Sequence, residues 1–218
     1  MKSLVLKDLY NIGHNVKSMV FILLVFACIF IPSLGAEAYI IMSGVLCSMM
    51  VSTTFGFDSN SKWTKYAMVT PITKKELVGS KFAVLLIFSA GGAVSGLVIG
   101  SIGGILTHKV IVGNIRDVLT LLLTGLLSLV IAEIIGGTSI PLLFQFVAEK
   151  ARMSTFVSFA IPFAVFFGIY AILTLLGVSF SDNLIFMLIC LSPLTALVWN
   201  LVMYRISYAV FEKKELLY

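Results

Sequence analysis

The chain has 218 residues, of which 60% are hydrophobic and only 11% are charged, with a formal net charge of +5. Soluble domains carry about 25% charged residues, so this composition excludes an ordinary soluble domain and predicts a polytopic membrane protein. The apolar runs are long and continuous, without the period-two alternation of a membrane β-barrel. The predicted fold class is therefore all-α, with several transmembrane helices.

Six apolar segments predict six transmembrane helices in a single transmembrane domain, residues 1–218. Ahead of them, residues 1–16 mix apolar and charged side chains, which predicts a short helix in the membrane interface; an ordinary extension of the first span is the alternative. The fourth span is longer than a bilayer needs, so it must tilt, kink at "GGTSIP" (136–141), or project. The approximate spans are 18–34, 39–57, 82–106, 118–147, 154–176 and 184–204, followed by a tail, 205–218.

Lysine and arginine are distributed unevenly between the segments that connect these spans. Thirteen of the fifteen lie on one side if the N-terminus is inside, and only Lys109 and Arg116 lie on the other. By the positive-inside rule, both termini and the loop 58–81 are predicted to be cytoplasmic, in a multi-pass protein of the cell membrane. The same rule accounts for the scattered basic charge, so a nucleic-acid surface is not expected.

The chain lacks the motifs that would support catalysis of its own. There is no GxxxxGK[ST] phosphate-binding loop, and the two histidines lie outside the spans on opposite sides. The three cysteines fall inside apolar runs without CxxC spacing, so no metal site is predicted. We therefore expect that the chain is not an enzyme and holds no cofactor itself.

The loop 58–81 reads "DSNSKWTKYAMVTPITKKELVGSK" and carries signals of ordered structure. Trp63 and Tyr66 are spaced i and i+3, so a short helix from about 61 to 68 would present an apolar aromatic face. Pro71 then breaks that helix. Thr73 and Glu76 form a T-x-x-E capping box, which predicts a new helix running into the third span. A flexible basic loop is the alternative, and the aromatic and capping signals argue against it.

Two features lie inside the predicted spans. Glu133 is an acidic residue near the middle of the fourth span, where a carboxyl group suggests either a functional role or a hydrogen-bonded bridge between helices. The third span carries a stripe of glycines with a period of four, which predicts close helix packing within the chain or, as the alternative, at a dimer interface or a moving seam. The stripe consists of Gly92, Gly96, Gly100 and Gly104.

The pattern "F-x-x-D…W-x-x-Y-A-x-x-x-P-I-T-K-K-E-L-V-x-S-K" lies between spans two and three of a six-span chain with an N-terminal interfacial helix. In this layout the chain resembles the ABC-2 type permeases, the membrane subunits of ATP-binding-cassette exporters. Within that family it is similar to the small permeases of phenol-soluble-modulin and bacteriocin-immunity exporters of Gram-positive bacteria. The motif-level resemblance rests on residues 55–81, with matches at Phe57, Asp58, Trp63, Tyr66, Pro71, Ile72, Glu76, Leu77 and Lys81.

The resemblance implies a type V exporter-like permease in which the elbow 58–81 is a coupling helix seated on a separate ATPase subunit. Two ATPase copies, which hold ATP and Mg²⁺, and a second permease copy, identical or paralogous, would complete the transporter in the lipid bilayer. The substrate implied is amphipathic, with an antimicrobial or modulin-like peptide favoured. The residues implied in ATPase coupling are Asp58, Lys62, Trp63, Lys65, Tyr66, Pro71, Thr73 and Glu76. Glu133 is a candidate for the substrate path.

Three other functions are weighed against an exporter subunit. A secondary transporter or channel would need several polar groups converging at the membrane midplane and an internal repeat, and only Glu133 offers such a group. A membrane-embedded enzyme is disfavoured because no catalytic constellation is present. An accessory or regulatory membrane protein is the remaining alternative. An outer region between spans five and six that is often enlarged in the family is short here, "GVSFSDN".

Overall fold

The computed structural model describes residues 1–13, 15–63, 66–67, 72–108, 115–146, 151–176 and 182–215, and within these residues every regular element is a helix. Six of the helical segments are long and apolar enough to cross a membrane, as predicted. The helices are α1 (Lys2–Gly13), α2 (Val16–Leu34), α3 (Ala36–Ser48), α4 (Met50–Asn60), α6 (Lys74–Leu106), α7 (Ile115–Gln145), α8 (Ala151–Leu175) and α9 (Asp182–Glu215).

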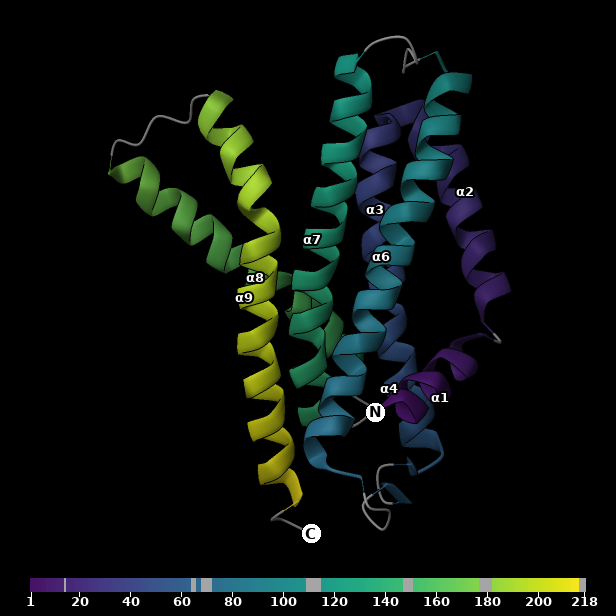
Figure 1. The fold of residues 1–218 in the computed structure, drawn as a ribbon, viewed down its shortest axis with the longest axis vertical. Coiled ribbons are helices and arrows are strands. Elements are labelled where there is room, and N and C mark those ends of the chain that lie inside the picture. Colours follow the sequence, from purple (N-terminus) through teal and green to yellow (C-terminus); the bar gives the residue numbers. More distant parts are fainter. Residues whose placement is uncertain are drawn as a thin grey trace.

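The helices α3, α6 and α7 form the centre of the bundle, and α9 packs along α7 (Figure 1). α1 is separate from α2 and lies across the end of the bundle where α4 leads toward α6, as Figure 1 shows. Its inner face is Leu4, Asp8 and Ile12, which are spaced four apart and buried. The predicted N-terminal helix is thus a separate element, packed against α4 and α6.

One long helix, α7, exceeds the thickness of the hydrocarbon core, and another, α9, extends beyond its predicted span. The fourth span is one helix of 31 residues, α7, with Pro141 inside its last turns. At 1.5 Å per residue it is about 46 Å long, so it is longer than the hydrocarbon core of about 30 Å. The tail predicted from 205 onward is instead helical as far as Glu215, because α9 continues through it and buries Phe211 in the main apolar cluster. The buried residues of this cluster are Ile12, Val51, Ala67, Leu77, Val78, Val84, Leu85, Ile140, Phe144 and Phe211.

The far halves of α8 and α9 lie apart from the rest of the bundle (Figure 1). α8 packs mainly against α7, and most of its aromatic side chains are exposed. The predicted short connection between these two helices falls largely outside the described residues. The bundle therefore has a tightly packed centre around α3, α6 and α7, and the far halves of α8 and α9 are loosely packed at one side.

Candidate functional site

The first turn of α6 has the capping box that the sequence predicts. The backbone N–H of Thr73 donates to the Glu76 carboxylate at 3.2 Å, and the backbone N–H of Glu76 donates to the Thr73 hydroxyl at 3.3 Å. The backbone hydrogen bond from Thr73, followed by the bond from its hydroxyl, lowers the pKa of the Glu76 carboxyl group below its usual value. These bonds fix the residue at which α6 begins, immediately after the loop.

A buried group of charged side chains joins α1, α4 and α6, and we call it the ion cluster: Lys7, Asp8, Asp58 and Lys81. The ammonium group of Lys81 is at its centre, 2.8 Å from Asp8 Oδ2 and 2.6 Å from Asp58 Oδ2. It also donates to the hydroxyl of Thr54 at 3.1 Å. Lys81 is 3% exposed and Asp8 only 1%, so these charges depend on one another rather than on water.

The second lysine connects the ion cluster to the loop. The ammonium group of Lys7 lies 2.5 Å from Asp58 Oδ1 and 3.1 Å from Asp8 Oδ1. It is also 4.6 Å from the centroid of the Trp63 ring, within the range of a cation–π interaction. The start of the loop, the N-terminal helix and the start of the third span are therefore tied together through a few charged side chains.

The structure places the predicted coupling residues in different environments. Tyr66 is 66% exposed, whereas Trp63 is partly buried against the main apolar cluster and the neighbouring Ala67 is fully buried. Of the predicted apolar aromatic face, Tyr66 is therefore the exposed part, whereas the Trp63 ring packs on the chain itself. Asp58 is also turned inward to Lys81. Lys65 and Pro71 lie outside the described residues.

Lys62 marks the point at which the chain leaves α4. Its φ of 52° is in the left-handed region, which is a frequent way for a helix to end. Its backbone N–H donates to the carbonyl of Ser59, and its side chain is exposed. Lys62 is thus free of the ion cluster and lies on the outer surface, beside the partly buried Trp63.

The ion cluster is not predictable from the sequence alone. Its parts come from segments that are far apart, because Asp8 and Lys81 are separated by 73 positions. One signal was available: Asp8 lies four residues from both Leu4 and Ile12, on what proves to be the buried face of α1. A charged residue within an apolar helical face implies a buried partner, although the spacing cannot say which one.

Glu133 bridges three helices through hydrogen bonds. One of its carboxyl oxygens is bonded to the hydroxyl of Ser89 on α6, and the other accepts from the Asn200 amide on α9 at 2.6 Å. One turn farther along α7, Thr138 accepts from the indole N–H of Trp199 at 3.0 Å. These contacts match the interpretation of Glu133 as a bridge between helices, and the carboxyl group is buried among its partners.

The glycine stripe of the third span packs against α3 of the same chain. A Cβ atom on Gly92 would lie 2.6 Å from Cβ of Cys47 and 2.9 Å from the Cα of Gly44. A Cβ atom on Gly96 would collide with the Ser43 hydroxyl. Gly100 faces Ile40 in the same way, and Gly104 is also buried. The first three glycines of the stripe therefore lie against residues of α3 in the same chain.

Among the described residues, no group of three or more histidine, cysteine or acidic side chains could hold a metal ion.

The sequence profile described as "ABC-2 family transporter protein" matches residues 3–212, nearly the whole chain. The chain belongs to the ABC-2 transporter family. No curated protein and no solved structure matches it significantly. It is therefore the membrane subunit of an ABC transporter, embedded through its apolar helices.

For this ABC-2 permease, the contacts of Glu133 lead to a prediction. Glu133→Gln retains one oxygen that accepts a hydrogen bond and gains an NH₂ group. That group can donate to the hydroxyl oxygen of Ser89 or to the side-chain carbonyl of a reoriented Asn200. We therefore expect the free energy of unfolding to fall by less than about 1 kcal/mol. Transport by the assembled complex should remain close to that of the wild type. Vesicle transport assays and thermal unfolding in detergent measure both. Loss of transport at unchanged stability would instead give the ionised or proton-carrying carboxyl group a direct role.

Proposed function

We propose that the chain is the permease subunit of an ABC exporter and couples ATP hydrolysis in a separate ATPase subunit to the export of an amphipathic substrate. A peptide of the antimicrobial or modulin type is the first candidate. The transporter would contain two ATPase copies, which hold ATP and Mg²⁺, and a second permease copy, identical or paralogous. Both termini and the loop 58–81 would face the cytoplasm, where the ATPase is found.

The observation that carries this proposal is the attachment of the loop at both ends. At its start, α4 and the loop are held by Asp58, which belongs to the ion cluster, and by Trp63, which contacts Lys7 of that cluster. At its end, the Thr73–Glu76 capping box begins a helix of 33 residues. A partner that moves the exposed surface of the loop would therefore move α6 as a rigid body, together with α1. This is the property that a coupling element requires.

Tyr66 is the side chain that tests this proposal most directly, because it is 66% exposed, whereas Asp58 and Trp63 contact Lys81 and Lys7 inside the protein. We expect Tyr66→Ala to weaken copurification of the permease with its ATPase by about tenfold, as loss of an aromatic contact in an interface does. ATP hydrolysis by the complex that remains should no longer respond to substrate. Pull-down with the coexpressed ATPase and steady-state ATPase assays measure both effects.

The matched control is Tyr10→Ala, which removes another exposed tyrosine, 85% accessible, from the outer face of α1. It should leave both copurification and coupled hydrolysis unchanged. Trp63→Ala is expected to have a larger effect than Tyr66→Ala, but it also removes the ring beneath Lys7 and so is less specific. Normal assembly and normal coupled hydrolysis in a double variant lacking both aromatics would rule out the loop as the coupling element.

A further inference from the structure

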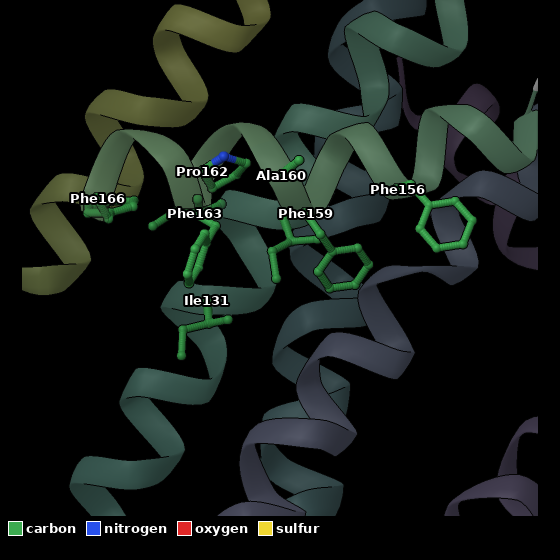
Figure 2. Close-up of a pocket in the computed structure, with 9 residues that line it drawn as sticks. Ile131, Phe156, Phe159, Ala160, Pro162, Phe163 and Phe166 are labelled. Atoms are coloured by element: carbon green, nitrogen blue, oxygen red, sulfur yellow. The ribbon is translucent and has the colours of Figure 1, made fainter. Parts of the chain in front are cut away.

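An apolar groove of about 540 Å³ lies between α7 and α8. Figure 2 shows phenylalanine side chains of α8 on the side of that helix that faces Ile131 of α7. Among these, Phe159 and Phe163 line the groove together with Ile134 and Ile135. Within the described residues, no charged or polar side chain is part of its lining. The groove by itself would accept any apolar chain, including an ordinary lipid tail.

A second, smaller crevice adjoins the groove and has a different chemical character. Ile135 and Phe159 belong to the linings of both cavities, so the two lie side by side. The crevice has room for about 10 Å³, the size of one water molecule. It is lined by hydroxyl side chains from the junction of α3 and α4, from α7 and from α8: Ser48, Ser52, Ser139, Ser154, Thr155 and Ser158.

The hydrogen bonds of these serines define which group would fit the crevice. Ser48, Ser139 and Ser158 each donate their single hydroxyl proton to a carbonyl of their own helix, at 2.6–2.8 Å. Toward the crevice, their oxygens can therefore only accept. Ser154 differs, because the residue is only 1% exposed and its buried hydroxyl has no hydrogen-bond partner within the described part of the chain. It can both donate and accept.

The complement of this lining is a small uncharged group that donates a hydrogen bond to one serine oxygen and accepts one from Ser154. An alcohol hydroxyl meets both requirements, whereas an ether oxygen can only accept. A carboxylate or an ammonium group would be buried without an opposite charge, since neither lining contains an ionisable side chain, and this is costly.

We propose that the groove and crevice together bind the amphipathic substrate of the permease, with its apolar chain along α7 and α8 and a small uncharged hydroxyl-type group at Ser154. This proposal rests on the exporter function proposed above and specifies the chemistry of its substrate. It adds, to the peptides named above, amphiphiles that carry a hydroxyl group beside an apolar chain as candidate substrates.

The test uses the purified full-length chain and a dodecanol that carries a photoactivatable diazirine on its alkyl chain. After illumination, the label should concentrate on α7 and α8 at groove residues identified by mass spectrometry. Unlabelled 1-dodecanol should compete at about fivefold lower concentration than methyl dodecyl ether, which has the same chain but cannot donate. Equal competition by the two compounds, or labelling spread over all lipid-facing helices, would overturn the proposal.

The substitution Ser154→Ala tests the role of this hydroxyl, and it breaks no side-chain hydrogen bond that the structure shows. In this variant, the fivefold preference for the alcohol should disappear. The matched control is Ser207→Ala, a buried serine on α9 that lies outside both cavities. It should keep the preference. Phe159→Trp, which places a larger ring where the two cavities join, should lower labelling at an unchanged melting temperature; labelling at wild-type levels there would count against the site.

A final arm separates an exported substrate from a resident membrane lipid. In the complex reconstituted with its ATPase, 1-dodecanol should stimulate ATP hydrolysis in the wild type and not in Ser154→Ala. Binding without stimulation would show that the site holds a structural lipid and would overturn its role in export. The labelling experiment needs no ATPase, so a negative result there would not count against the proposed exporter function. Conversely, failure of the permease to copurify with an ATPase would not change the labelling result.

Discussion

Replacing Lys81 with methionine is expected to destabilise the folded chain by about 3–5 kcal/mol, because it leaves a buried charge without its partner. Methionine fills a similar volume, so the loss comes from the two carboxylates that Lys81 contacts, Asp8 and Asp58. Lys7 alone then faces both of them. The shift of the thermal unfolding midpoint of the detergent-solubilised protein measures the effect.

Lys75→Met is the matched control for Lys81→Met. It removes an exposed lysine from the first turn of the same helix, and it should change stability by less than about 0.5 kcal/mol. The double variant Lys81→Met with Asp58→Asn should lose less than the sum of the two single variants, since the second change removes one of the stranded charges. Additive losses would mean that the ion cluster does not act as a unit.

Gly92→Ala is expected to cost about 2–3 kcal/mol, the upper part of the range for overpacking a close-packed site. The new methyl group would overlap the Cβ of Cys47 and the Cα of Gly44. These atoms are part of or next to the α3 backbone, so no side-chain rotation can relieve the overlap and the two helices must separate. Thermal unfolding in detergent measures the loss.

The preceding residue provides the control for this substitution. Gly91 is exposed on the same helix, and a Cβ atom there meets nothing within 4 Å. Gly91→Ala should therefore leave stability unchanged or raise it by about 0.5–1 kcal/mol, since alanine loses less conformational freedom on folding than glycine. If both substitutions had the same effect, helix propensity and not close packing against α3 would explain the result.

Several parts of the fold were predictable because they depend on local or one-dimensional properties. The six spans follow from runs of apolar residues, which is a property of composition along the chain. The start of α6 follows from Thr73 and Glu76, which are only three residues apart. The four-residue period of the glycines indicated close packing, but the identity of the facing helix, α3, required the structure.

The continuation of α9 through the predicted tail shows a limit of the hydropathy argument. Arg205 and the charged residues after it end the apolar run, so hydropathy ends the span near 204. They do not end the helix, because Ser207 and Phe211 still face inward, and Phe211 joins the main apolar cluster. The transition from apolar to amphipathic sequence marks the edge of a membrane span rather than the end of a helix.

By itself, the sequence determined the class of this protein, its spans, the capped start of its third span and its resemblance to ABC-2 permeases. Only the tertiary structure showed that Lys81 pairs with Asp8 and Asp58, that Trp63 packs inward while Tyr66 remains exposed, and that serines of several helices share one crevice. The physical reason is that apolar runs and capping signals act over a few neighbouring residues, whereas burial of a charge or a hydroxyl is decided by partners from distant segments, and spacing along the chain does not specify them.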